Sequence, residues 1–275
     1  MVKLYLDSRA RSFGTHENFT VALPTTLDLK TEHLALLDTC CIPNTWKTVG
    51  AHNKFMYLLE TASGTETYRR VALVEGNYNA ISLADAFQTT LNQGKSLSGS
   101  YSVDYDFRAN RIGVANSLAS GESFAIWGAD YLKANVSLWN NKGSTQITHG
   151  TRDSGWTLGF NSANAPTNHS VTSELQADSA PNLHQHHSIF IHSDMGSPGE
   201  AYGPGGQQDI VRRCVITAGP GEINISSHAT AFDTIKIAPG TLSSLSFRLA
   251  GYDGETIDLN GHPWSFSLCL YPESE

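Results

Sequence analysis

The densest group of side chains that could do chemistry in this sequence is a set of histidines. His184, His186 and His187 are followed by His192. A His-x-His pair on a β-strand points both imidazoles to one side of a sheet, which is how cupin-type sandwiches offer ligands to a metal ion. That pattern also needs a nearby Glu ligand, whereas residues 188–191 read Ser-Ile-Phe-Ile. We therefore interpret the cluster as a polar run entering a buried strand, predict no metal site, and leave pH sensing by the imidazoles as an open hypothesis.

Other residue types used in catalysis have no supporting spacing. The Gly-x-Ser-x-Gly pattern of a nucleophile elbow is absent, and Gly196-Ser197-Pro198-Gly199 has a different spacing. Asp104 and Asp106 alternate on a predicted strand, and we interpret them as solvated acids rather than as the paired carboxyl groups of a glycosidase. Residues 203–206, Gly-Pro-Gly-Gly, lack the Lys-Ser/Thr that completes a phosphate-binding loop. We predict that the protein is not an enzyme and has no catalytic or cofactor-binding residue.

Arginine pairs and loop aromatics are better suited to binding than to catalysis. Arg69-Arg70 and Arg212-Arg213 lie on predicted strands, so one Arg of each pair should face outward, toward another subunit, an anion or solvent. Trp139, Trp156 and Tyr202 could stack on sugar rings, or they could pin a long loop to the fold. A carbohydrate- or receptor-binding β-sandwich, such as a vertex attachment module, is therefore one alternative function. A metal-dependent β-sandwich enzyme built on the His cluster is another.

Alternation of apolar and polar residues predicts a chain made almost entirely of β-strands. Strand patterns bounded by turn residues occur at 19–23, 33–42, 55–60, 68–74, 101–105, 111–115, 123–127, 188–192, 209–216, 222–226, 234–237, 245–249 and 263–271. The run at 33–42 is apolar without alternation, as in a strand buried on both faces. One short amphipathic helix is predicted at 83–92, from a capping box formed by Ser82 and Asp85 and from Gly94 after its end.

These elements predict an all-β fold, a β-sandwich with one short helix and a long loop-rich insertion. No shift in composition divides the 275 residues, so we expect a single domain over 1–275, with a Ser- and Asn-rich excursion at about 128–207. Cys40, Cys41, Cys214 and Cys269 form no Cys-x-x-Cys pair and are expected to be reduced thiols. Neighbours Cys40 and Cys41 should point to opposite faces of a strand.

Composition excludes several classes of protein. Only 16% of residues are charged, and the formal net charge is -8. An acidic chain is repelled by phosphates, so we expect no direct contact with nucleic acid. No stretch approaches the roughly 20 apolar residues that span a bilayer, and the segment before Asp7 is too short for a signal peptide. We expect a protein made in the cell interior, not secreted, with a surface of Ser, Thr and Asn side chains.

The order of short motifs resembles that of a known family. The motifs are Asp7-Ser8-Arg9, 18–23, 42–49, 74–78, Ser82-Leu83, 158–160, 247–249, 253–254, 257–261 and 264–268. This order resembles the penton, or minor capsid, single jelly-roll proteins of virophages, Polinton-like viruses, adintoviruses and related large DNA viruses. The resemblance extends over residues 7–271 and departs at 128–207.

The resemblance implies a structural role in a virion. Subunits of this family form homopentamers that plug the five-fold vertices of an icosahedral shell, where they contact the major capsid protein. A closed ring needs heterologous contacts between unlike surfaces, and low charge with many Ser, Thr and Asn side chains suits wet, polar subunit contacts. The expected fold is a single jelly roll, and the family offers no active site to carry over. Another minor capsid protein of the same fold is the nearest alternative to a penton.

Overall fold

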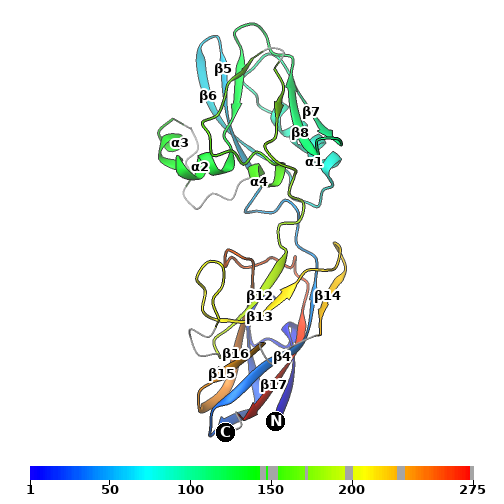
Figure 1. The fold of residues 1–275 in the computed structure, drawn as a ribbon, viewed down its shortest axis with the longest axis vertical. Helices are drawn as coiled ribbons and strands as arrows, with labels where there is room; N and C mark the ends of the chain where they lie inside the picture. Colours follow the sequence, from blue (N-terminus) through cyan, green and yellow to red (C-terminus); the bar gives the residue numbers. More distant parts are fainter. Residues whose placement is uncertain (143–146, 148–153, 171–172, 196–200, 228–232, 273–275) are drawn as a thin grey trace. The chain divides into compact units, whose positions relative to one another are not determined.

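The computed structural model describes residues 1–142, 147, 154–170, 173–195, 201–227 and 233–272. The contacts of the chain form two compact units, drawn in Figure 1: unit 1 is Met1–Trp46 with His186–Glu275, and unit 2 is Lys47–Gln185. This differs from the single domain expected over 1–275. One of the two boundaries between the units falls inside the expected excursion at 128–207, whose residues up to 185 belong to unit 2 and the rest to unit 1.

Unit 1 consists of two antiparallel sheets. The first contains β1 (Val2–Asp7), β17 (Ser265–Pro272), β4 (His33–Pro43) and β14 (Ile223–Ser226) in this order, and β15 (Thr234–Ile237) also pairs with β4. The second contains β13 (Ile210–Val215), β12 (Ser188–Ser193), β16 (Gly240–Ala250), β3 (Asn18–Leu29) and β2 (Phe13–Gly14). A short 3₁₀ helix, η1 (Ser8–Ala10), follows β1, and both chain ends lie in this unit (Figure 1).

The strand order of unit 1 is that of a single jelly roll. With β14 and β15 counted as one position and the two-residue β2 left out, eight strands follow one another along the chain. The first sheet then has the order first, eighth, third, sixth, and the second has the order fifth, fourth, seventh, second. This interleaving of two four-stranded sheets defines the jelly roll. The predicted all-β jelly-roll class is confirmed for unit 1, and unit 2 is inserted between its third and fourth strands.

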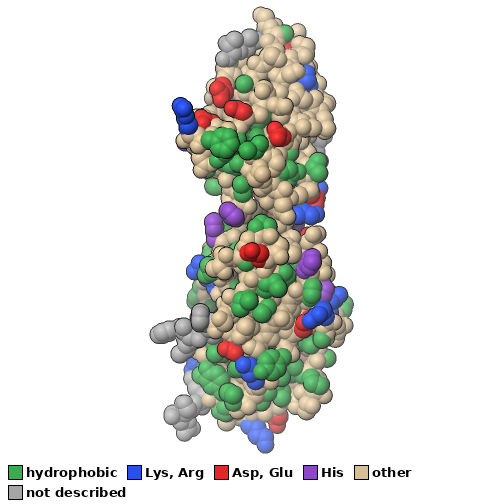
Figure 2. Space-filling view, turned by 90° about the vertical axis from the view of Figure 1, so that its right-hand side faces the viewer, with side chains coloured by type: hydrophobic (Ala, Val, Ile, Leu, Met, Phe, Trp, Pro, Cys, Tyr) green, Lys and Arg blue, Asp and Glu red, His purple; other side chains and the backbone are tan. Residues whose placement is uncertain are grey.

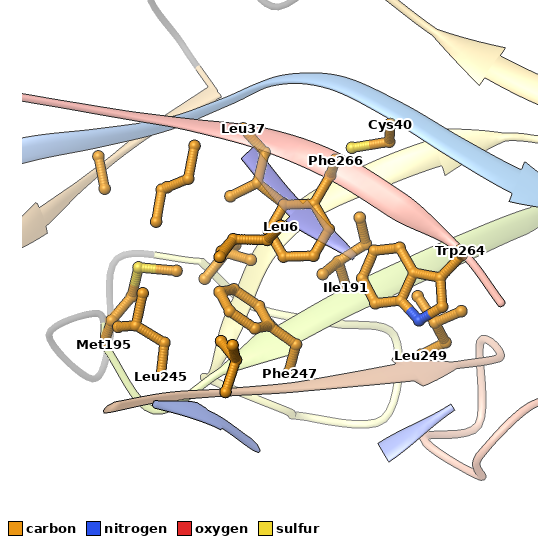
Figure 3. Packing of buried hydrophobic residues seen from close by; sticks show 14 of the residues in the cluster. Leu6, Leu37, Cys40, Ile191, Met195, Leu245, Phe247, Leu249, Trp264 and Phe266 are labelled. Carbon is orange, nitrogen blue, oxygen red and sulfur yellow. The ribbon is translucent and has the colours of Figure 1, made fainter. Parts of the chain in front are cut away.

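Aromatic and aliphatic side chains fill the space between the two sheets of unit 1. In Figure 3, Leu37 and Phe266 from the first sheet point toward Phe247 and Leu249 from the second. The ring of Phe266 lies 4.6 Å from that of Phe247 and 4.7 Å from the stacked indole of Trp264, measured between centroids. Burial of these side chains is the main stabilising contribution to the sandwich. The interior is a packed core.

Unit 2 contains two further sheets and four α-helices among its described residues. One sheet has the order β10 (His169–Ser170), β9 (Ser123–Ile126), β5 (Phe55–Ala62) and β6 (Thr65–Ala72), and the other has β11 (Leu175–Gln176), β8 (Arg111–Asn116) and β7 (Tyr101–Asp106). The helices are α1 (Ala80–Asn92), α2 (Ala129–Ala134), α3 (Val136–Lys142) and α4 (Ser154–Leu158). The expectation of one helix is therefore wrong, because three further short helices lie in the expected excursion. The described helices include none long and apolar enough to cross a bilayer.

Helix α1 was predicted in type, and its start lies earlier than expected. The Asn79 side chain accepts a 2.8 Å hydrogen bond from the Ser82 N–H, and the Ser82 hydroxyl lies 3.0 Å from the Asn79 N–H. The capping box is thus Asn79–Ser82, one turn before the expected Ser82–Asp85. The predicted apolar stripe is buried in the core of unit 2, and Gly94 has a φ of 64° just past the end of the helix.

Candidate functional site

The predicted histidine cluster does not form one site. His184 and His187 are exposed, and His186 is half-buried with its ring edge-to-face against Trp46 at 5.9 Å between centroids. Of the four, His192 alone lies within a strand, β12, where its side chain is 2% exposed. Within the described ranges, no group of three His, Cys, Asp or Glu side chains could hold a metal ion. The cluster is a polar run that leads into a buried strand.

His192 forms a dyad with a carboxylate. Its Nδ1 lies 2.7 Å from Oδ1 of Asp209, and the other carboxylate oxygen lies 3.8 Å from Nη2 of Arg248. Burial lowers the pKa of His192, although the neighbouring carboxylate opposes this shift. Its Nε2, the position facing the nucleophile in a catalytic triad, has no hydrogen-bond partner among the described residues. The dyad therefore ties the segment before β13 to β12.

The predicted acidic and glycine-rich motifs have structural roles. Asp106 accepts hydrogen bonds from the N–H groups of Arg108 and Ala109 at 2.7 and 3.2 Å, so it caps the turn between β7 and β8. Asp104 is exposed on β7, as expected of a solvated acid. Residues 203–206 form a tight turn closed by a 2.9 Å hydrogen bond from the Gly206 N–H to the Gly203 carbonyl. The Gly196–Gly199 motif lies outside the described residues.

The fully buried carboxylate of unit 2 is Glu60, which sequence reasoning missed. It lies 2.9 Å from the Arg69 guanidinium and accepts a 2.7 Å hydrogen bond from the Tyr101 hydroxyl. The N–H and hydroxyl of Ser96 also donate to it, both at 2.7 Å. Burial, reinforced by the carboxylate, raises the pKa of Tyr101. Through these hydrogen bonds and this ion pair, Glu60 holds the segment after α1 against β5. The signal in the sequence was a Glu directly after the apolar run of β5.

A second carboxylate holds the same segment. Glu122 accepts hydrogen bonds from the N–H and hydroxyl of Ser98 at 2.7 and 2.8 Å, and from the Ala119 N–H at 2.9 Å. These backbone hydrogen bonds hold the pKa of Glu122 at about 2. Glu60 and Glu122 together hold residues 96–99 in place.

The two arginine pairs each place one side chain inward and one outward, as predicted. Arg69 enters the Glu60 network, whereas Arg70 is exposed, with its guanidinium carbon 4.3 Å from the centre of the Phe55 ring. Arg212 is buried and crosses unit 1 from β13, where Nη1 donates to the Asp38 carbonyl of β4 at 3.0 Å. Its partner Arg213 is exposed. The inward arginines are structural, and the outward ones remain for solvent or a partner.

The three aromatic residues predicted in loops also divide into buried and exposed side chains. Trp139 is fully buried and packs edge-to-face against Tyr57 and Trp127 at 5.0 and 5.3 Å between centroids, so it pins α3 to unit 2. Trp156 and Tyr202 are exposed. Unit 2 also has a hollow of about 250 Å³ lined by both apolar and polar side chains, among them Phe160, Pro166, His169, Leu175 and Asp178. Neither exposed aromatic residue lines it.

All four cysteines are free thiols in the structure. Cys40 and Cys214 are buried in the core of unit 1, whereas Cys41 and Cys269 are half-buried. Cys40 and Cys41 thus point to opposite faces of β4, as the strand geometry predicts.

Exposed apolar side chains of unit 1 lie mainly on the outermost strands of its sheets. Such residues are Val2 and Tyr5 on β1, Phe13 on β2, Val215 on β13, and Ile223 and Ile225 on β14. Natural proteins usually protect such strands with charges or prolines, because an open edge invites pairing with another chain. Figure 2 shows hydrophobic side chains gathered in patches on the molecular face in view, with isolated charged groups between them. The chemistry of this surface suits contacts with protein.

Comparisons with known proteins find likeness in structure but none in sequence. No protein-family model matches the sequence, and no curated protein is significantly similar to it. Among solved structures, the crystal structure of selenomethionine-labelled mavirus penton protein matches 98% of this chain over 99% of its own, with 10% sequence identity and a TM-score of 0.44.

Proposed function

We propose that this chain is a structural subunit of a viral capsid and that it acts by assembling with copies of itself and with a shell protein. The observation that carries the proposal is the construction of unit 1. Its jelly roll has an interior filled by Phe247, Trp264 and Phe266, and its outermost strands expose apolar side chains. Jelly rolls serve as capsid, lectin and cupin domains. Because the interior of this one is filled by side chains, we infer that it functions through contacts of its outer surface. We infer that the protein is not an enzyme.

Motifs that carry the sequence resemblance make structural contacts in both units. Asp7 caps η1 by accepting a 2.8 Å hydrogen bond from the Arg9 N–H. The Ser8 hydroxyl accepts a 3.0 Å hydrogen bond from the buried N–H of Trp264, which joins the first and last strands of the sandwich. Asn77 accepts a 3.0 Å hydrogen bond from the Thr48 N–H. These contacts support the resemblance because they need these residue types at these places.

In its finer form, the proposal is that the chain is a penton. Five copies would form a ring at a five-fold vertex of an icosahedral shell and contact the major capsid protein. The protein would be made in the host cell and reside in the virion. With a net charge of -8, it would contact protein rather than the genome.

Sizing by multi-angle light scattering, with electron microscopy of the same sample, tests this proposal. We expect rings of five copies, and we expect them to join shells formed by the major capsid protein of the same virus. A strict monomer that never associates with that shell protein would contradict the proposal. A tetramer or hexamer that joins the shell would retain a capsid role but exclude the penton.

A receptor- or carbohydrate-binding role is the second candidate, favoured by the exposure of Trp156 and Tyr202. Exposed aromatic rings can stack on sugars. Binding to a glycan array that is lost in Trp156→Ala or Tyr202→Ala would support it, and a silent array would count against it. Trp139 takes no part in this hypothesis, because the structure buries it.

A further inference from the structure

The central strand β4 is apolar on both sides, whereas unit 1 buries one side completely and the other partly. Side chains directed into the core are at most 1% exposed: Ala35, Leu37, Cys40 and Ile42. Leu34, Leu36 and Cys41 alternate with them on the opposite side and are only half-buried. The sequence of β4 is typical of a strand covered on both faces. The sandwich supplies one cover, and the second remains open.

Strand register extends this open side across the whole first sheet. On β17, Cys269 lies opposite Leu36 and Tyr271 lies opposite Leu34, while Ile225 of β14 lies opposite Cys41. Residues opposite one another in an antiparallel pair share a face. We define the outer face as these residues with Tyr5 of β1 and Ile223 of β14; its members are Tyr5, Leu34, Leu36, Cys41, Ile223, Ile225, Cys269 and Tyr271. Tyr5, Ile223 and Ile225 are 80%, 58% and 65% exposed.

The second sheet of unit 1 has a different exterior. Its outward positions carry small or polar side chains, such as Thr20 and Ala22 on β3 and Ser244 and Ser246 on β16, which lie opposite one another in register. This is the usual alternation of an antiparallel sheet with one face in water. Apolar exceptions on its outward side include Phe13 of β2, Phe190 of β12 and Val215 of β13, and no two of these lie opposite one another in register. A continuous apolar outer face is therefore found on the first sheet.

Charge on and beside the outer face is slightly positive, although the chain as a whole is acidic. By register, Lys3 of β1 and Lys236 of β15 lie on the face itself. Lys3 pairs with Asp38 at 2.8 Å, and Asp7 of β1 pairs with Arg9 at 2.6 Å. These five charges sum to +1, within a chain of net charge -8. Two copies of such a chain repel one another over most of their surface. Contact of this face with the acidic surface of a neighbour avoids that repulsion, so the outer face is electrostatically suited to a second copy.

The size of the outer face also fits contact with a folded protein. The eight residues of β17 and the width of four strands define roughly 500 Å² of sheet, at about 3.4 Å per residue and about 4.8 Å per strand. A standard interface buries about 800 Å² on each partner, of which somewhat more than half is apolar. The face, polar and apolar positions together, therefore supplies more than half of one side of a standard interface.

We propose that the outer face is covered by a second copy of this chain. The inference rests on the proposed function and adds the surface through which one subunit contacts the next. A closed ring joins unlike surfaces, so the outer face of one copy meets a different surface of its neighbour. The outer face lies on the first sheet of the jelly roll, and its most exposed apolar residues are Tyr5, Ile223 and Ile225.

Paired variants test the proposal by the size of the assembled protein. Ile223→Lys with Ile225→Lys places two charges on the outer face, whereas Ala22→Lys with Thr26→Lys places two at exposed positions of β3 in the other sheet. We expect wild type and the β3 variant to form rings and the β14 variant to remain monomeric, each with an unchanged circular dichroism spectrum. Rings formed by the β14 variant would overturn the inference and leave the proposed function intact. A monomeric wild type that joins no shell would overturn both.

The cysteines provide a second test that needs no substitution in the assembled protein. Cys41 and Cys269 lie on the outer face, and Cys40 and Cys214 lie in the core as internal references. A hydrophilic maleimide should modify the two outer-face thiols at least ten-fold more slowly in wild-type rings than in diluted wild-type monomer, as read by peptide mass spectrometry. Equal modification rates in rings and in monomer would overturn the inference. This test does not depend on whether the β14 variant folds. Protection that appears only when the shell protein is added would likewise overturn it and identify that protein as the cover.

Discussion

Substitution of Ser8 by Ala should destabilise unit 1 far more than its size suggests. The Ser8 side chain connects the segment that follows β1 to the segment that precedes β17. Its hydroxyl accepts a 3.0 Å hydrogen bond from the buried backbone N–H of Trp264 and lies 2.8 Å from Nδ1 of His16. The Ser8 side chain is itself fully buried. Alanine would leave the Trp264 N–H without an acceptor in a place that water does not reach.

The expected magnitude follows from these two bonds. A buried N–H left without its partner costs about 1–3 kcal/mol, and a lost partly buried side-chain hydrogen bond costs about 0.5–1.5 kcal/mol. We expect a loss of about 2–3 kcal/mol in the free energy of unfolding of unit 1, or roughly 30–140-fold in its unfolding equilibrium. Ser12→Ala is the matched control. The Ser12 hydroxyl donates to the Thr20 carbonyl at 3.0 Å in an exposed position, where water can replace it.

Hydrogen exchange with mass spectrometry measures this effect unit by unit. Amides of β1 and β17 that exchange through unfolding of unit 1 should exchange faster by the same factor in Ser8→Ala, while peptides of unit 2 report no change. Ser12→Ala should lie within about 0.5 kcal/mol of wild type, as surface substitutions usually do. If the two variants exchange alike, the Ser8–Trp264 contact does not stabilise the sandwich and the reasoning is refuted.

Three further predictions concern other buried groups. Because its pKa is lowered to about 2, Glu122 contributes its full stability above about pH 4.5, and this is lost as the pH falls toward 2; protection factors of residues 96–99 should fall in that window, and not in Glu122→Gln. Trp139→Ala should cost unit 2 about 3–5 kcal/mol in urea unfolding, whereas exposed Trp156→Ala should cost less than about 0.5 kcal/mol. Arg212→Met should destabilise unit 1 by about 1.5–3 kcal/mol, because the Asp38 carbonyl and the Ser226 hydroxyl lose a charged hydrogen-bond donor; a fully neutral result would contradict a structural role.

The sequence predicts local structure better than it predicts which strands share a sheet. The strands at 55–60, 101–105 and 123–127 have the same alternation as those of the jelly roll, so period alone assigned them to one sandwich. Strand partners are set by contacts between residues far apart in the chain, and a Ser- and Thr-rich composition common to both units leaves no boundary signal. The α1 stripe was clear, but Asn79 and Ser82 both suit an N-cap, and the choice depends on the preceding turn.

The candidate sites show the same limit. The exposure of His184 and His187 follows from a polar run, and the opposite orientations of Cys40 and Cys41 follow from strand geometry. The Glu60 network could not be foreseen, because its partners Arg69 and Ser96 approach only when β6 and the segment after α1 meet β5. The apolar run of β4 predicts burial of both faces of the strand. Within a single chain one face is fully buried and the other is only half-buried.

The position of unit 2 within the jelly roll also sets an order of events at the ribosome. Unit 2 is one continuous segment, so its contacts are complete once residue 185 has emerged. The first sheet of unit 1 instead pairs β1 with β17, with Val2 opposite Leu270, and it cannot close until the last strand has been made. Unit 2 can therefore fold while unit 1 is still incomplete, and the sheet that carries the outer face is the last to form. Assembly through the outer face, as we propose it, would therefore have to follow the synthesis of β17.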